Sequence, residues 1–346
     1  MKMCVLALSM VLVFCAGCTQ TSGKETAATE NVQLSESTHP PQNTATESVE
    51  ISTPVGGETV DEDGIAQEAE VLEKAEAAMP KLKTVESPGI LTESEGGAQI
   101  DYSNTSKGYV TVRFTEQIRQ RLKVQVKGPT TTYTYNLTPG HWEAFPLSDE
   151  EGDYQVQVYS NVTGNKYALV LSASMTVTLE DPFGPFLHAN QYVDFEDAPE
   201  TVALAWELTG GLSDPLEKVA AVYDYVIANI SYDRELAQTV KSGYLPELDR
   251  VLEKGKGICF DYAALMTGML RSQGIPAKLV VGYAGSVYHA WISVWSEHTG
   301  WIDGVIWFDG QQWQRMDPTF AASGNGEPEI QTYIGNGENY RAKYFY

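Results

Sequence analysis

Three side chains in the C-terminal half of the chain are of the types that nucleophilic catalysis uses. Cys259 offers a thiol, His289 an imidazole that can take a proton, and Asp317 a carboxylate that can orient the ring. A nucleophile, a base and an orienting group form the triad of acyl-transfer chemistry. The sequence therefore predicts that Cys259, His289 and Asp317 meet in one site, and no cofactor is expected there.

The residues around Cys259 predict a helix that begins at the thiol. Gly255 and Gly257 precede it, an apolar helical pattern follows it, and Gly274 with Pro276 ends that pattern. Backbone N–H groups in a first helical turn have no partner within the helix and favour an anion. This position therefore favours the thiolate of Cys259, and the same N–H groups can hold an oxyanion. Asp261 is interpreted as a first-turn residue without a catalytic role.

Two strands are expected to position the base and the carboxylate. Residues 277–283 and 288–295 are rich in β-branched and aromatic residues, which is typical of strands. His289 lies in the second of them. A polar insert at 297–312 follows, and Asp317 comes at the end of a further predicted strand. Neighbouring strands would place the Asp317 carboxylate beside the His289 ring.

Five short segments together resemble the transglutaminase-like superfamily, whose fold is related to papain-like cysteine proteases. They are residues 257–263, 274–277, 282–283, 289–291 and 317–319. The resemblance implies an α+β core, with Cys259 as nucleophile, His289 as general base and Asp317 as orienting residue. It also implies a protein or peptide substrate whose amide bond is converted to a thioester. Water resolves that thioester by hydrolysis, which we favour, and an amine resolves it by crosslinking.

Several alternatives to this hydrolase interpretation stay open. The protein could be a protein-glutamine transamidase, or a non-catalytic binding module of the cell envelope that keeps the three residues. Cys259 alone could be a buried structural thiol, and Asp317 before Pro318 a turn residue. One cysteine and one histidine without short ligand spacing do not favour a metal site, so no metal is expected.

The N-terminal 18 residues resemble a bacterial lipoprotein signal. Lys2 precedes an apolar run too short to span a bilayer, and small residues lead to Cys18. The resemblance implies cleavage before Cys18 and a lipid on that residue, which would anchor the protein to the cell membrane on its extracytoplasmic side. Because cleavage removes Cys4 and Cys15, Cys259 would be the free thiol that remains. Residues 19–60 are rich in Thr, Ser, Glu, Gln and Pro, and residues 19–84 are predicted to form a disordered acidic tether.

Between the tether and the catalytic region, the sequence predicts an antiparallel β-sandwich over residues 85–183. Alternating apolar and polar residues recur there in short runs separated by Gly, Pro, Asn and Asp. No residue of this segment is expected to take part in chemistry. Residues 184–346 are predicted to form the transglutaminase-like (papain-like) α+β core, which begins with a helix over 214–230. The predicted fold class is therefore α+β, with the sandwich first.

The charge balance limits the classes of partner. The formal net charge is −23, with 46 acidic and 23 basic residues. A chain this acidic would repel nucleic-acid phosphates instead of neutralising them. It also has no basic surplus with which to dock on an anionic surface. We therefore expect no nucleic-acid partner, and membrane attachment through the N-terminal lipid alone.

Overall fold

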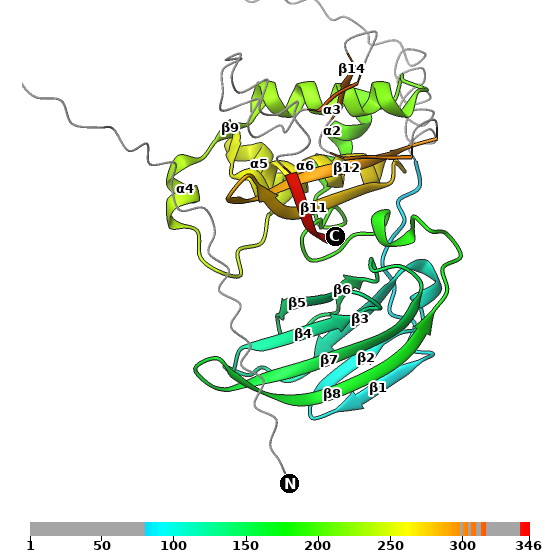
Figure 1. The fold of residues 1–346 in the computed structure, drawn as a ribbon, viewed down its shortest axis with the longest axis vertical. Helices are drawn as coiled ribbons and strands as arrows, with labels where there is room; N and C mark the ends of the chain where they lie inside the picture. The colour runs from blue at the N-terminus through cyan, green and yellow to red at the C-terminus, as the bar shows by residue number, and fades with distance from the viewer. Residues whose placement is uncertain (1–79, 298–299, 304–305, 309–312, 316–339) are drawn as a thin grey trace, which may run out of the picture. The chain divides into compact units, whose positions relative to one another are not determined.

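The architecture is seen in a computed structural model that describes residues 80–297, 300–303, 306–308, 313–315 and 340–346. The predicted signal and most of the predicted tether lie outside the described residues. Figure 1 shows the described chain, with β-strands coloured cyan to green first and a mixed region coloured green to red after it. None of the described helices is long and apolar enough to cross a membrane.

Eight strands form two antiparallel sheets in the first half, which confirms the predicted sandwich. One sheet has the order β1-β2-β3-β6 and the other has the order β5-β4-β7-β8. The bounds are β1 (Thr92–Glu95), β2 (Ala98–Asp101), β3 (Tyr109–Phe114), β4 (Leu122–Lys127), β5 (Thr132–Leu137), β6 (Glu143–Pro146), β7 (Gly152–Thr163) and β8 (Lys166–Val177). A short 3-10 turn, η1 (Thr105–Lys107), precedes β3, and a second, η2 (Gly184–Phe186), follows β8.

Strands β4 and β5 show why this sequence folds as a sandwich. Val124 on β4 pairs with Tyr135 on β5, and Val126 pairs with Tyr133. All four side chains are buried in the hydrophobic core. The residues between them alternate to the other face of the sheet, because side chains along a strand alternate. The opposite face of β4 and β5 is therefore polar.

The second half is an α+β fold built around one buried helix. Its helices are α2 (Pro199–Thr209), α3 (Pro215–Asn229), α4 (Arg234–Thr239), α5 (Leu248–Lys254) and α6 (Cys259–Ser272). Its strands are β9 (Ser231–Tyr232), β10 (Lys256–Gly257), β11 (Ala277–Ala284), β12 (Val287–Ser296), β13 (Gly300–Asp303), β14 (Ile306–Phe308), β15 (Trp313–Arg315) and β16 (Tyr340–Phe345). Every residue of α6 is buried, and the helix contacts α2, α3 and α5 as well as β11 and β12.

Local signals account for the helix boundaries. The side chain of Asp214 accepts a hydrogen bond from the N–H of Leu216 and caps α3, as the sequence predicts. Helix α6 ends at Ser272, and Gly274 follows in the left-handed region with a φ of 75°. Glycine adopts that conformation without the strain that a side chain would add.

The main sheet of this half has the order β13-β12-β11-β16, and all its pairings are antiparallel. Strand β13 lies within residues 297–312, which the sequence analysis interprets as a polar insert. Trp301 on β13 contacts Trp295 on β12 and Phe186, at ring-centroid distances of 5.7 and 5.3 Å.

A buried arginine ties distant segments to α6. Arg271 donates to the main-chain oxygens of Ala277 at 2.9 Å, His188 at 2.8 Å and Tyr346 at 2.6 Å. Its side chain is 2% exposed. One compact unit holds residues Ala78–Tyr346, so these contacts lie inside it. The guanidinium therefore donates to main-chain oxygens from three separate segments, and the Tyr346 oxygen also accepts from the N–H of Leu279 at 2.9 Å.

Candidate active site

Cys259 is the first residue of α6, as the sequence predicts, and its side chain is 2% exposed. Gly257, just before it, has no room for a side chain. A Cβ on Gly257 would lie 2.6 Å from Cβ of Asp261. The glycine therefore lets the chain turn tightly into α6 and present the sulfur at the start of the helix.

Asp261 fixes this first turn, in agreement with its predicted structural role. One carboxylate oxygen accepts from the N–H of Ile258 at 2.8 Å, and the other accepts from the hydroxyl of Tyr244 at 2.7 Å. Burial raises the pKa of Asp261, while those two hydrogen bonds oppose the rise. Tyr244 is a residue that the sequence did not single out. It lies in the loop before α5 and connects that loop to the start of α6.

His289 lies on β12, opposite Gly282 of β11. Its ring lies 6.5 Å from the ring of Trp291, at an interplanar angle of 22°, so both side chains share one face of the strand. Gly282 is needed because a Cβ there would lie 2.1 Å from the main-chain oxygen of Arg341 on β16. The close approach of β16 therefore depends on the glycine opposite the histidine.

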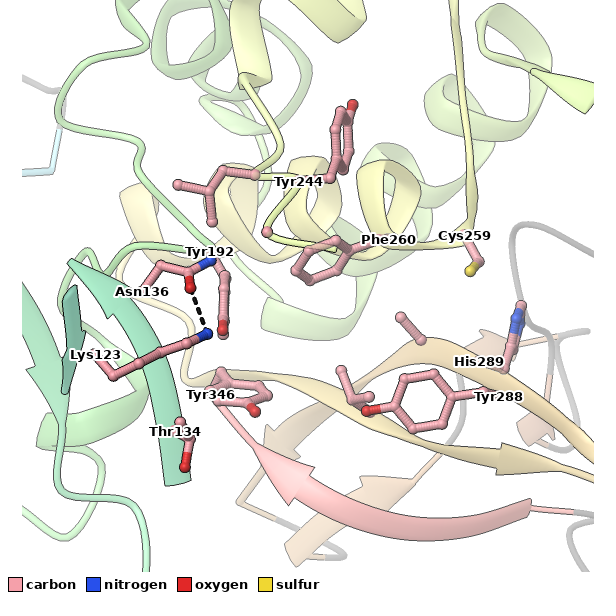
Figure 2. Close-up of a pocket in the computed structure, with 14 residues that line it drawn as sticks. Lys123, Thr134, Asn136, Tyr192, Tyr244, Cys259, Phe260, Tyr288, His289 and Tyr346 are labelled. Carbon is pink, nitrogen blue, oxygen red and sulfur yellow. Dashed lines mark hydrogen bonds between the residues drawn. The ribbon is translucent and has the colours of Figure 1, made fainter. Parts of the chain in front are cut away.

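The structure brings Cys259 and His289 to the same pocket. In Figure 2 the sulfur extends from the start of α6, and the His289 ring extends from β12 toward the same region. The other lining residues come from α6, β12 and six further stretches of the chain. They are Lys123, Thr134, Asn136, Tyr192, Gly243, Tyr244, Leu245, Phe260, Val281, Tyr288, Ala290 and Tyr346.

The other two predicted site residues, Asp317 and Cys18, lie outside the described residues. The described strand that precedes Asp317 is β15, which pairs with β14. Within the described residues, β12 is flanked by β11 and β13. The orienting role of Asp317 and the lipid on Cys18 therefore stay predictions.

The β-sandwich contributes residues to the pocket. Lys123, Thr134 and Asn136 line the pocket that holds Cys259, although the sequence singles out none of them. In the sequence, these residues have the alternating pattern of the polar face of a sheet. That pattern does not show whether a polar side chain faces solvent or lines a pocket. No local sequence signal could have identified them.

A family described as the transglutaminase-like superfamily matches residues 202–318. Bacillus subtilis (strain 168) YebA, described as an uncharacterized protein, is 28% identical over 179 residues, which are 45% of this chain and 24% of YebA. A protein-glutamine gamma-glutamyltransferase of Pseudomonas aeruginosa is 30% identical over 122 residues, 30% of this chain and 17% of that enzyme. The chain thus spans a quarter or less of these two relatives.

Among solved structures, a proposed cysteine protease from Cytophaga hutchinsonii is similar to this chain with a TM-score of 0.33 and 18% identity. The similarity covers 63% of this chain and 81% of that structure.

Proposed function

We propose that the protein is a cysteine enzyme that acts on amide bonds of proteins or peptides, and the match of residues 202–318 to the transglutaminase-like superfamily supports this proposal. The observation that carries the proposal is the shared pocket of Cys259, at the start of a buried helix, and His289, on the adjoining strand. A thiol at a helix start beside an imidazole is the arrangement of an activated nucleophile.

The proposed reaction has two halves. In the first, His289 takes the thiol proton as the sulfur of Cys259 attacks the amide carbon, and N–H groups at the start of α6 hold the oxyanion. The C–N bond then breaks, the amine leaves with the proton from His289, and a thioester remains. In the second half, His289 removes a proton from water, which attacks the thioester and releases the acid and the thiol. Asp317 is proposed to orient the imidazole throughout.

Hydrolysis and crosslinking differ only in the second half. We favour hydrolysis of an envelope protein or peptide. Protein-glutamine transamidation is the second candidate, because the relative in Pseudomonas aeruginosa carries that name. Either activity needs the same nucleophile and base, so the two candidates share the site and differ in the acceptor of the acyl group.

The acceptor can be measured directly. A panel of glutamine-containing and other peptides is incubated with the protein in ¹⁸O-labelled water, with and without millimolar cadaverine, and the products are weighed by mass spectrometry. We expect products that carry one ¹⁸O in a new carboxyl group, and we expect them to stay dominant when the amine is present.

Two other results would contradict the favoured hydrolysis. Cadaverine adducts as the main product would replace hydrolysis by transamidation. Unchanged peptides across the panel, with full alkylation of Cys259 by iodoacetamide, would favour the non-catalytic binding module.

Membrane anchoring is a separate proposal, supported by the lipoprotein-like sequence before Cys18. Replacing Cys18 by serine removes the thiol that would carry the acyl chains, and one acyl chain or more is needed for membrane affinity. We expect Cys18→Ser protein to move from the detergent-rich phase to the aqueous phase in a detergent partition experiment. Cys4→Ser, which changes a cysteine within the predicted signal, serves as the control and should partition like the wild type. Equal partitioning of Cys18→Ser and wild type would contradict lipid attachment at Cys18.

A further inference from the structure

One wall of the pocket that holds Cys259 comes from the β-sandwich. Lys123 on β4 pairs across the ladder with Asn136 on β5, and Thr134 lies two residues away on β5, opposite Gln125. Because these residues alternate with buried core residues, they share the polar face of the two strands. Three of the four line the pocket: Lys123, Thr134 and Asn136.

Lys123 is held in position by a neutral side chain. Its ammonium donates to Oδ1 of Asn136 at 2.5 Å (dashed line in Figure 2). Burial lowers the pKa of Lys123, and the neighbouring Arg121 lowers it further. Within the described part of the chain, no carboxylate pairs with Lys123. This is notable in a protein with 46 acidic residues.

Aromatic rings lie between this cation and the thiol. Tyr192 contacts the rings of Phe260 and Tyr346, with centroids 5.3 and 4.7 Å apart. In the view of Figure 2, Lys123 lies toward the left end of the pocket and Cys259 with His289 toward the right, with Tyr192, Tyr346, Phe260 and Tyr288 between them. The pocket therefore presents an apolar middle, a reactive end and a cationic end.

From this arrangement we propose that Lys123 is a specificity-determining residue, which binds a carboxylate of the acyl-donor peptide at the end of the pocket remote from Cys259. The proposal rests on the function proposed above and names the substrate class of the same site. The peptide would carry its carboxylate on an acidic side chain or at its C-terminus, separated from the reacting carbonyl by a stretch that lies on the tyrosines.

A carboxylate fits this end better than a larger anion. Among the described lining residues, Lys123 is the one lysine or arginine. A lysine ammonium is a point charge with three donors, one of which Asn136 already occupies. A single cation with a polar neighbour matches a single negative charge, whereas phosphate sites commonly add arginine forks or clusters of backbone N–H groups.

Affinity alkylation tests this proposal without requiring any amide cleavage. The probes are iodoacetyl-oligoglycines of one to four residues, each made with a C-terminal carboxylate and with a C-terminal carboxamide. The measured quantity is the ratio of the two alkylation rates of Cys259, normalised to the ratio for iodoacetate and iodoacetamide. This normalisation removes the general repulsion of anions by the acidic protein.

At the length that reaches Lys123, we expect the carboxylate probe to react about five- to tenfold faster, which is the effect of one partly exposed charged hydrogen bond. Lys123→Met should bring the normalised ratio to about one, and Lys123→Gln provides a second neutral variant. Lys123→Arg should keep most of the preference. Lys127→Met is the matched control, because Lys127 lies on the same face of β4, is also half-buried and does not line the pocket.

A normalised ratio near one for wild type at every probe length would overturn the proposal. So would a preference that Lys123→Met and Lys123→Gln leave unchanged, or one that Lys127→Met also abolishes. Because alkylation needs only an accessible thiol, a carboxylate preference without peptide cleavage would instead leave Lys123 as an anion-binding residue and count against the proposed enzyme activity.

Discussion

Replacing Cys259 by alanine is expected to lower the amide-cleaving activity by at least about a thousandfold, because the nucleophile is lost while the pocket stays. Stability should change little. Cys259 lies at a pocket wall, so the missing sulfur leaves a small cavity that costs on the order of 1 kcal/mol. The measurements are the rate of peptide hydrolysis and the melting temperature of both proteins.

The control for this substitution lies at the other end of the same helix. Ser272 is also buried in α6 but does not line the pocket, so Ser272→Ala should keep the activity of the wild type. His289→Ala should reduce activity by a similar factor to Cys259→Ala. The double variant should then be no worse than either single one, because a nucleophile and its base act as one unit. Activity of Cys259→Ala near the wild-type level would remove Cys259 from the mechanism.

The largest loss of stability is expected from Arg271→Met. Methionine fills much of the space but removes the arginine donor from the main-chain oxygens of Ala277, His188 and Tyr346. The Tyr346 oxygen keeps its hydrogen bond from the N–H of Leu279. A buried carbonyl left unpaired costs about 1–3 kcal/mol, offset in part because no charge need be buried. We expect the free energy of unfolding to fall by about 3–5 kcal/mol, measured by urea denaturation.

Two further substitutions show whether the three hydrogen bonds cause this loss. Arg271→Lys keeps the charge but not the planar fork, so it should recover only part of the stability. Arg250→Met removes an exposed arginine of α5 whose salt bridge with Glu247 is solvated, and it should cost less than about 0.5 kcal/mol. A loss of under 1 kcal/mol for Arg271→Met would show that Arg271 is not needed to join these segments.

The elements whose structure depends on residues close by along the chain could be predicted from the sequence. The start of α6 at Cys259 follows from the glycines before it, and its end follows from Gly274. The strand that carries His289 follows from β-branched and aromatic residues. The sandwich follows from alternation within each strand, because the period of two is a local property of the chain.

The residues that the sequence did not reveal depend on partners far along the chain. Lys123 reads as an ordinary polar-face residue, and only the fold brings it to the pocket of Cys259. Tyr244 lies 17 residues from the Asp261 carboxylate to which it donates. Arg271 donates to an oxygen 83 residues before it and to another 75 residues after it. Hydrophobic periodicity carries no information about such pairs.

The position of β16 in the sheet has a consequence for the order of events during synthesis. Strand β16 pairs with β11, and Tyr346 lines the pocket, although both follow Cys259 in the chain. As the ribosome extends the polypeptide, α6 and its thiol emerge well before the segment that closes the sheet beside them. A nascent or stalled fragment that ends before β16 therefore carries the thiol of Cys259 without the part of the pocket that Tyr346 lines. Long-range pairing of this kind also slows folding.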